Sequence, residues 1–204
     1  MKVKQALAEL ADHHKKMLTE ESGISEIVVA ARGYRTVTDA EELSSMGFED
    51  YQCLAPGLLI PVRGTSEEII FHRFRPDEPR TKKNGKPVKY EQPVDTPIVL
   101  DVPLPAQRYL RDVTRRLWVV EGEKKADALV SRGEVALSLL GVWSWKREDL
   151  LLREWDDIAT IGREVLVAFD SDASEKYAVR LARQRLADVL LRRGGHTEDE
   201  RSYA

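Results

Sequence analysis

Cysteine is nearly absent from this 204-residue chain, which contains only Cys53. A single cysteine excludes a disulfide within the chain and a zinc site built from cysteine thiolates. A long apolar run is also missing, and the first four residues lead into a polar amphipathic stretch. The sequence therefore predicts neither a signal peptide nor a membrane-spanning segment, and we expect a cytoplasmic location.

The chain has no excess of positive charge, since 32 Lys and Arg residues face 35 Asp and Glu residues for a formal net charge of −3. Net charge therefore does not predict a nucleic-acid partner. Such a partner would have to be held by a local basic patch or through metal ions. Apolar residues make up 42% of the chain, which is enough for a folded domain with a hydrophobic core.

Helical spacing dominates the N-terminal region. Apolar residues within 4–20 lie on one face and predict a single amphipathic helix. His13 and His14 fall on this helix, where adjacent side chains point about 100° apart. We interpret them as solvated surface and not as a metal-binding pair. Two short helices are expected at 25–31 and 39–46, each followed by a glycine.

Extended segments follow these helices. The apolar stretches 58–62 and 69–75 predict two strands joined by a turn. Residues 76–88 are polar and contain prolines and Asn84-Gly85, which predicts a loop or hairpin tip.

Strands and helices alternate from residue 117 onward. We predict strands at 117–120, 135–140 and 165–169, and helices at 123–131, 148–159 and 175–193. This alternation favours a parallel sheet and an α/β fold. We divide the chain into a helical region at 1–55, a small α+β subdomain at 56–115, a parallel-sheet domain at 116–195 and a polar tail at 196–204.

Three carboxylates directly follow predicted strands. Glu121 comes after the first strand of the parallel sheet, and Asp170 and Asp172 come after the third. Ligands of open parallel sheets bind at the carboxyl ends of the strands, and neighbouring strands lie about 5 Å apart. Carboxylates this close repel each other unless a cation lies among them, and oxygen ligands favour Mg²⁺ or Mn²⁺. A plainer alternative is that Asp172 only caps the following helix.

A basic cluster in this acidic chain is the candidate nucleic-acid contact. It contains Arg73, Arg75, Arg80, Lys82, Lys83, Lys86 and Lys89. Alternation along a strand places Arg73 and Arg75 on one face and Phe74 on the other. A basic face backed by aromatic packing suits a phosphate backbone, although a plain solvated surface is the alternative. Lys124 and Lys125, which follow Glu121 on the first turn of a helix, are further candidates because a lysine there opposes the helix dipole, and a solvated helix face is the equal alternative.

Three stretches of the last ninety residues resemble the TOPRIM domain of bacterial primases, topoisomerases and related nucleases. They are Leu-Trp-Val-Val-Glu-Gly-Glu-Lys-Lys-Ala-Asp-Ala-Leu at 117–129, the segment 136–142, and Val-Leu-Val-Ala-Phe-Asp-Ser-Asp at 165–172. The preceding segments 57–63, 69–75 and 86–91 resemble the subdomain that comes before TOPRIM in DnaG-type primases. The overall likeness extends to an uncharacterised TOPRIM-like family of plasmid and phage replication proteins.

This resemblance implies a TOPRIM-type fold in which Glu121, Asp170 and Asp172 hold catalytic Mg²⁺. It also places Arg75 and Lys89 where the family contacts template and nucleotides. The implied partners are single-stranded DNA, nucleoside triphosphates and a helicase or second replication subunit. We therefore expect a primase-like nucleotidyltransferase of the DNA-directed RNA polymerase type. A TOPRIM nuclease and a non-catalytic DNA- or helicase-binding module remain open as alternatives.

The chain departs from the primase pattern in three respects. Primases usually carry an acidic residue four positions after the glutamate, where this chain has Lys125. The cysteines of the primase zinc-binding domain are missing. After the long helix only Gly194-Gly195 and a polar tail follow, so we expect the last TOPRIM strand to be absent or supplied by another chain.

Overall fold

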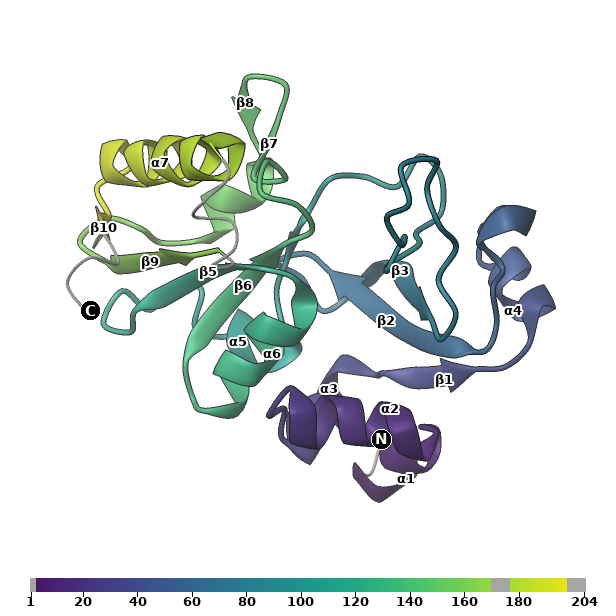
Figure 1. Cartoon of the computed structure of the whole chain (residues 1–204). Coiled ribbons are helices and arrows are strands. Elements are labelled where there is room, and N and C mark those ends of the chain that lie inside the picture. The colour runs from purple at the N-terminus through teal and green to yellow at the C-terminus, as the bar shows by residue number, and fades with distance from the viewer. Residues whose placement is uncertain (1–2, 170–176, 198–204) are drawn as a thin grey trace. The chain divides into compact units, whose positions relative to one another are not determined.

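The computed structural model describes residues 3–169 and 177–197 of the chain (Figure 1). It divides into two compact units, each with its own sheet. Unit 1 comprises Met1–Val62 and Glu68–Pro97, and unit 2 comprises Arg63–Glu67 and Ile98–Ala204. The four segments defined from the sequence stay predictions. None of the described helices combines the length and apolarity needed to cross a bilayer.

Unit 1 surrounds a three-stranded sheet with short helices. Its elements are α1 (Val3–Ala8), α2 (Asp12–Lys16), a π-helical turn η1 (Met17–Glu21), α3 (Glu26–Arg32), β1 (Arg35–Val37), α4 (Ala40–Ser45), a 3-10 turn η2 (Asp50–Gln52), β2 (Gly57–Arg63) and β3 (Ile69–Pro76). The strand order is β1-β2-β3, with β1 antiparallel to β2. The helices expected after residues 25 and 39 are confirmed, and Ser25 and Asp39 cap them as N-terminal acceptors.

The single helix expected at 4–20 is wrong, because the chain bends between α1 and α2. The bend is held by Thr36 of β1, whose Oγ1 accepts a hydrogen bond from the Ala11 N–H at 2.8 Å. The Thr36 N–H in turn donates to the Glu9 carbonyl at 3.0 Å. These contacts with β1 satisfy backbone groups that would otherwise continue the helix. Residues 12–16 therefore start a separate helix.

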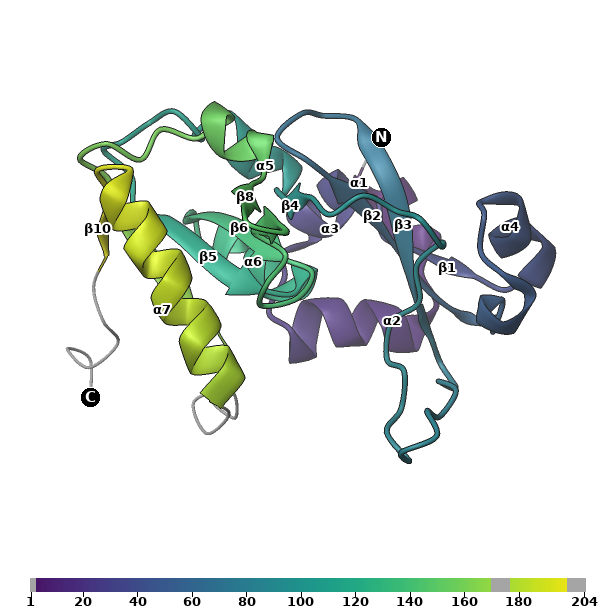
Figure 2. The same ribbon diagram turned by 90° about the horizontal axis from the view of Figure 1, so that it is seen from above.

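Unit 2 is built on a five-stranded sheet flanked by helices. Its elements are β4 (Leu100–Asp101), α5 (Leu104–Gln107), β5 (Leu117–Glu121), α6 (Glu123–Ser131), β6 (Val135–Leu139), β7 (Lys146–Arg147), β8 (Leu150–Leu151), a 3-10 turn η3 (Arg153–Asp157), β9 (Glu164–Ala168), α7 (Tyr177–Arg192) and β10 (His196–Thr197). The sheet order is β10-β9-β5-β6-β4. Figure 2 shows β5 and β6 of this sheet from above, together with α7. Strands β10, β9, β5 and β6 are parallel, and β4 is antiparallel to β6.

Two expectations for unit 2 are corrected by the structure. The helix expected at 148–159 is wrong, because a β7–β8 hairpin turns through Glu148 at a φ of 55° and η3 follows it. The expectation that the strand after the long helix is missing is also wrong. His196 and Thr197 form β10, which pairs in parallel with Glu164 and Val165 of β9.

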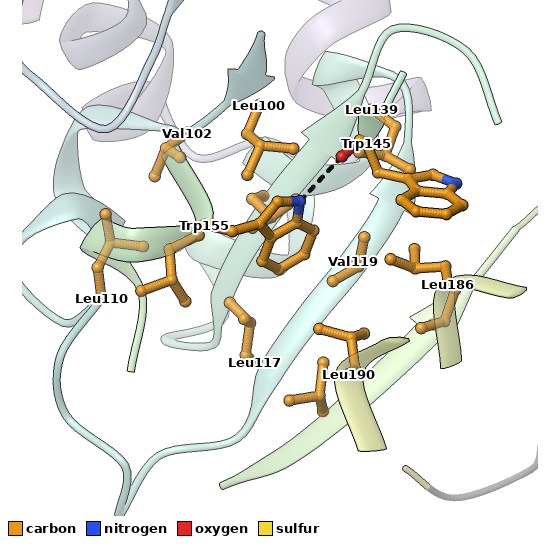
Figure 3. Close-up of a cluster of buried hydrophobic side chains, with 14 of the residues drawn as sticks. Leu100, Val102, Leu110, Leu117, Val119, Leu139, Trp145, Trp155, Leu186 and Leu190 are labelled. Carbon is orange, nitrogen blue, oxygen red and sulfur yellow. Dashed lines mark hydrogen bonds between the residues drawn. The ribbon is translucent and has the colours of Figure 1, made fainter. Parts of the chain in front are cut away.

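Alternating side chains of the central strands build two hydrophobic layers in unit 2. One face of the sheet packs against α7 through Leu186 and Leu190, and the other packs against α6 through Ala126. Figure 1 shows these two helices on opposite faces of the sheet. In the larger layer, the fully buried Trp155 donates its indole N–H to the Trp145 carbonyl at 3.1 Å (Figure 3). This bond satisfies the one polar atom of the largest core side chain.

A buried cation fastens the amino ends of the strands in unit 2. Arg163 directly precedes β9 and has no exposed surface. Its guanidinium donates hydrogen bonds of 2.8 to 3.3 Å to four carbonyl oxygens, those of Tyr109, Leu110, Arg115 and Ala159. Burial lowers the pKa of Arg163, and the charge of Asp112 partly opposes this shift. The side chain thus joins the segment before β5 to the segment before β9.

We predict that Arg163→Met destabilises the protein by about 3 kcal/mol, because four buried or partly buried carbonyls lose their donor at once. The matched control is Arg116→Met, since Arg116 is 43% exposed and pairs with Glu164 at 3.3 Å. The control should change stability by less than about 1 kcal/mol. Urea unfolding followed by circular dichroism measures both values, and equal losses for the two variants would contradict the assigned role of Arg163.

Candidate functional site

Glu121 ends the central strand of the parallel sheet. It pairs with Leu139 of β6, and the preceding Val120 pairs with Ala168 of β9. Because the three strands run in the same direction, their carboxyl ends meet at one edge of the sheet, which we call the carboxyl edge. Glu121 is partly buried there, and its carboxylate makes no hydrogen bond or ion pair within residues 3–169 and 177–197.

The other two predicted metal ligands, Asp170 and Asp172, lie outside the described residues. The last residue of β9 is Ala168, two positions before Asp170 in the chain. The convergence of the Glu121, Asp170 and Asp172 carboxylates on one point therefore stays a prediction.

Gly122 leaves open space beside Glu121. It precedes α6 with a φ of 91° and a ψ of 140°, a conformation that strongly favours glycine. Its N–H donates to the Leu139 carbonyl at 3.0 Å, which fixes the start of α6 against β6. A Cβ atom built here meets no atom of residues 3–169 and 177–197 within 4 Å. The described residues thus leave the space beside the Gly122 Cα open.

Two buried acids on α6 were missed by the sequence analysis. Glu123 is 1% exposed and Asp127 is fully buried. They lie four residues apart, and this spacing puts both on one face of the helix. The helical spacing of two acids could have revealed them, but acids are usually expected on an exposed face. Lys125, which stands where primases usually carry an acid, is exposed.

The two arginines of β3 lie on the face opposite Phe74, which is fully buried as the alternation predicts. The Arg73 guanidinium lies over the Tyr90 ring at 4.6 Å from its centroid. The Arg75 Nη1 donates to Met17 Sδ at 2.8 Å. Both side chains are partly buried and already packed against unit 1. Their charges are therefore held in defined places on this unit.

Arg80 forms an ion pair with Glu91 and is therefore not part of an unpaired basic surface. Its Nε and Nη2 donate to Glu91 Oε1 at 2.6 Å and Oε2 at 3.0 Å. Glu91 is 2% exposed and also accepts a hydrogen bond from Gln52 Nε2. The hydrogen bond to Glu91 raises the pKa of Arg80 above its usual value. This pair closes the base of the loop that follows β3.

The lysines of the predicted nucleic-acid contact divide between the two units. The loop after β3 in unit 1 exposes Lys83, Lys86 and Lys89. The first turn of α6 in unit 2 carries Lys124 and Lys125. Lys124 is partly buried. The assignment of these residues to a nucleic-acid contact stays a prediction.

His13 and His14 are not the solvated pair expected from the sequence. His14 is fully buried, with Nε2 at 2.8 Å from Asp77 Oδ1 and Nδ1 at 2.8 Å from Thr36 Oγ1. His13 Nε2 lies 3.0 Å from Asp77 Oδ2. Burial lowers the pKa of His14, and its hydrogen bond to Asp77 partly opposes this shift. The bend at Ala11 is the physical reason, because it reorients the short helix that carries both rings.

Sequence comparison gives a match over part of the chain. Residues 107–199, nearly all of the region after the small subdomain, match the model of a domain of unknown function, DUF3854. Among curated protein sequences, none matches this chain.

Structural comparison assigns the fold. The primase of Aquifex aeolicus, solved as zinc-binding and RNA polymerase domains, superposes with a TM-score of 0.61 at 15% identity over 96% of this chain and 52% of its own. A DNA primase domain from Pseudomonas aeruginosa gives a TM-score of 0.61 at 19% identity over 98% and 70%. The RNA polymerase domain of Mycobacterium tuberculosis primase DnaG, solved with a double-stranded DNA oligomer carrying a 6-nucleotide overhang, gives 0.57 at 18% over 85% and 62%.

This chain therefore has the α/β fold of primase catalytic cores. The predicted resemblance to the DnaG-type primase is confirmed at the level of the fold. The chain spans about half the length of the Aquifex primase it matches.

We predict that Gly122→Ala destabilises the protein by about 2–3 kcal/mol, because an alanine is strained at this φ and ψ. Gly133, at the other end of α6, is the matched control, with a φ of 87° and open space around it. Gly133→Ala should cost only about 1 kcal/mol, as expected for a left-handed position. Thermal and urea unfolding of both variants test this order. A smaller loss at Gly122 than at Gly133 would show that the conformation before α6 is not the constraint.

Proposed function

We propose that this chain is a Mg²⁺- or Mn²⁺-dependent, primase-like nucleotidyltransferase core that joins nucleoside triphosphates on a single-stranded DNA template. The observation that carries the proposal is the position of Glu121. Its carboxylate has no protein partner within the described residues, and it ends a central parallel strand in a primase-like fold. Ligands of open parallel sheets bind at this edge.

The described part of the proposed metal site suits a hard cation. Glu121 offers oxygen ligands, and Gly122 leaves space beside them. Asp170 and Asp172 would complete an oxygen-only ligand set, which favours Mg²⁺ or Mn²⁺ over zinc. When bound, the cation would stabilise negative charge on the transferred phosphoryl group and orient the attacking hydroxyl.

The remaining residues of the carboxyl edge would position a nucleotide. The N–H groups at the start of α6 can donate to a phosphate oxygen. Lys124 lies on the same first turn, where its charge opposes the helix dipole unless an anion is present, and Lys125 follows it. We propose that these two lysines neutralise the triphosphate. They would thereby reduce the repulsion between it and the carboxylates.

Template binding is assigned to unit 1. Lys83, Lys86 and Lys89 are exposed on one loop, so they can neutralise successive phosphates without first breaking an internal ion pair. Arg73 and Arg75, held by packing on β3, would add fixed charges. A helicase or second replication subunit, in a plasmid or phage replication setting, is the proposed wider context.

We predict that Glu121→Gln lowers primer synthesis at least about 100-fold while the fold is retained, because a neutral amide is a weaker ligand for a hard cation. The assay incubates protein with single-stranded DNA, labelled ribonucleotides and Mg²⁺ or Mn²⁺, and resolves the short products. Glu154→Gln is the matched control, since Glu154 is another partly buried glutamate, and it should retain activity. Circular dichroism verifies that both variants fold.

The same assay separates the rival functions. Extended products that depend on Glu121 support nucleotidyl transfer. Shortened DNA in the wild type would instead assign phosphodiester hydrolysis to the carboxyl edge. Unchanged DNA, together with DNA binding that persists in EDTA, would show a non-catalytic binding module and reject the proposed activity.

We predict that the double variant Lys83→Ala/Lys86→Ala weakens single-stranded DNA binding about tenfold and reduces the steepness of log K against log salt by about 1.4, as expected from two lost phosphate contacts. The control is Lys4→Ala/Lys16→Ala, which removes two other exposed lysines of unit 1 and the same net charge. Fluorescence anisotropy at several salt concentrations measures both effects. If the control weakens binding equally, general charge and not this loop holds DNA.

A further inference from the structure

We propose that His13, His14 and Asp77 form a second metal site, selective for Zn²⁺ or a similar borderline transition-metal ion. The three residues offer one ligand atom each, and these atoms lie within 4.8 Å of one another. All three belong to unit 1, so the cluster does not depend on how the two units are arranged. The site is independent of the proposed Mg²⁺ site and of the proposed polymerase activity.

The geometry brings both imidazoles to one carboxylate. His14 Nε2 lies 2.8 Å from Asp77 Oδ1, and His13 Nε2 lies 3.0 Å from Asp77 Oδ2. The two ring centroids are 4.0 Å apart. With metal–nitrogen and metal–oxygen bonds of about 2.0–2.2 Å, ligand atoms around one ion lie roughly 3 Å apart. The observed separations therefore need only small side-chain adjustments to receive an ion.

The cluster is supported by an outer set of hydrogen bonds. His14 Nδ1 lies 2.8 Å from Thr36 Oγ1, and this leaves Nε2 as the nitrogen that faces Asp77. Thr36 is itself fixed by accepting the Ala11 N–H. The Asp77 N–H donates to the Pro56 carbonyl at 3.0 Å and holds the start of the loop after β3. Metal-binding histidines usually have such a partner on the other ring nitrogen.

The ligand chemistry selects the ion. Two imidazoles and one carboxylate suit Zn²⁺, Ni²⁺ or Cu²⁺, whereas Mg²⁺ prefers oxygen ligands and water. Three protein ligands leave a coordination position for water. The side chain of His13 is 57% exposed, so an ion can reach the cluster. The nearby cation Arg75 donates a hydrogen bond from Nη1 to Met17 Sδ at 2.8 Å.

Metal binding here would cross-link two parts of unit 1. His13 and His14 lie on α2, while Asp77 directly follows β3. β3 carries Arg73 and Arg75, which we assign to template binding. The ion would therefore hold the N-terminal helices against the end of the strand that presents these charges. No cysteine is needed, so the scarcity of cysteine in the chain does not exclude this zinc site.

The test measures zinc binding by the full chain after EDTA treatment and removal of the chelator. We expect one equivalent of Zn²⁺ in calorimetry with ZnCl₂, a rise in thermal stability, and visible ligand-field bands when CoCl₂ replaces zinc. His13→Ala should weaken zinc binding at least about 100-fold and abolish the thermal shift, because a direct ligand should matter at least as much as an outer-sphere partner. Its largely exposed side chain makes the variant expected to fold. Asp77→Asn should likewise lose the zinc-dependent stabilisation.

Two controls make the result specific. His196→Ala removes an exposed histidine from unit 2 and should leave zinc affinity unchanged. Glu121→Gln should also bind zinc as the wild type does, even where primer synthesis is lost. The proposal is overturned if the wild type binds no stoichiometric zinc, or if His13→Ala binds it with the affinity and thermal shift of the wild type. Equal losses in His13→Ala and His196→Ala would also overturn it.

Discussion

The parallel pairing of β5 with β6 on one edge and with β9 on the other is the constraint on which the rest of unit 2 depends. Because this register aligns the three strands, their carboxyl ends reach a common edge. Alternate residues of the strands then face α6 and α7 on the two sides of the sheet. The position of Glu121 follows from that register and not from any contact of its own. A shift of one residue would turn Leu117 and Val119 out of the larger core and move the carboxylate to the opposite face.

Stability and the proposed chemistry are separated along the same strands. Arg163 binds backbone carbonyls at the amino ends, where it joins the segments that enter β5 and β9. Glu121 and Gly122 lie at the carboxyl ends. Because the buried cation does not contact the site, substitutions at the two ends should have separable effects on unfolding and on activity. In unit 1, the charged side chains of β3 are likewise held by packing against Tyr90 and Met17.

The sequence predicted the central elements of unit 2 well because their signals are local. Short, mostly apolar runs at 117–120, 135–140 and 165–169 marked β5, β6 and β9, and a glycine follows the end of α6. Elements set by distant partners were not predicted. Strand β10 is two residues long and exists through its pairing with β9. The buried His14 is hydrogen-bonded to Thr36, more than twenty residues away. Arg80 was predicted to belong to an exposed basic cluster, but it is paired with Glu91. The candidate site was predicted only in part, since Glu121 lies where expected but Asp170 and Asp172 fall outside the described residues.

The ion pair between Arg80 and Glu91 has a consequence for how this protein can change. It clamps the two ends of a loop whose tip contains Lys83 and Lys86, and backbone hydrogen bonds between Phe74 and Glu91 reinforce the clamp. Insertions, deletions or altered charge spacing within the tip would therefore not propagate into β3. The loop is thus a segment in which ligand preference can diversify among relatives while the hydrophobic core behind it stays constant.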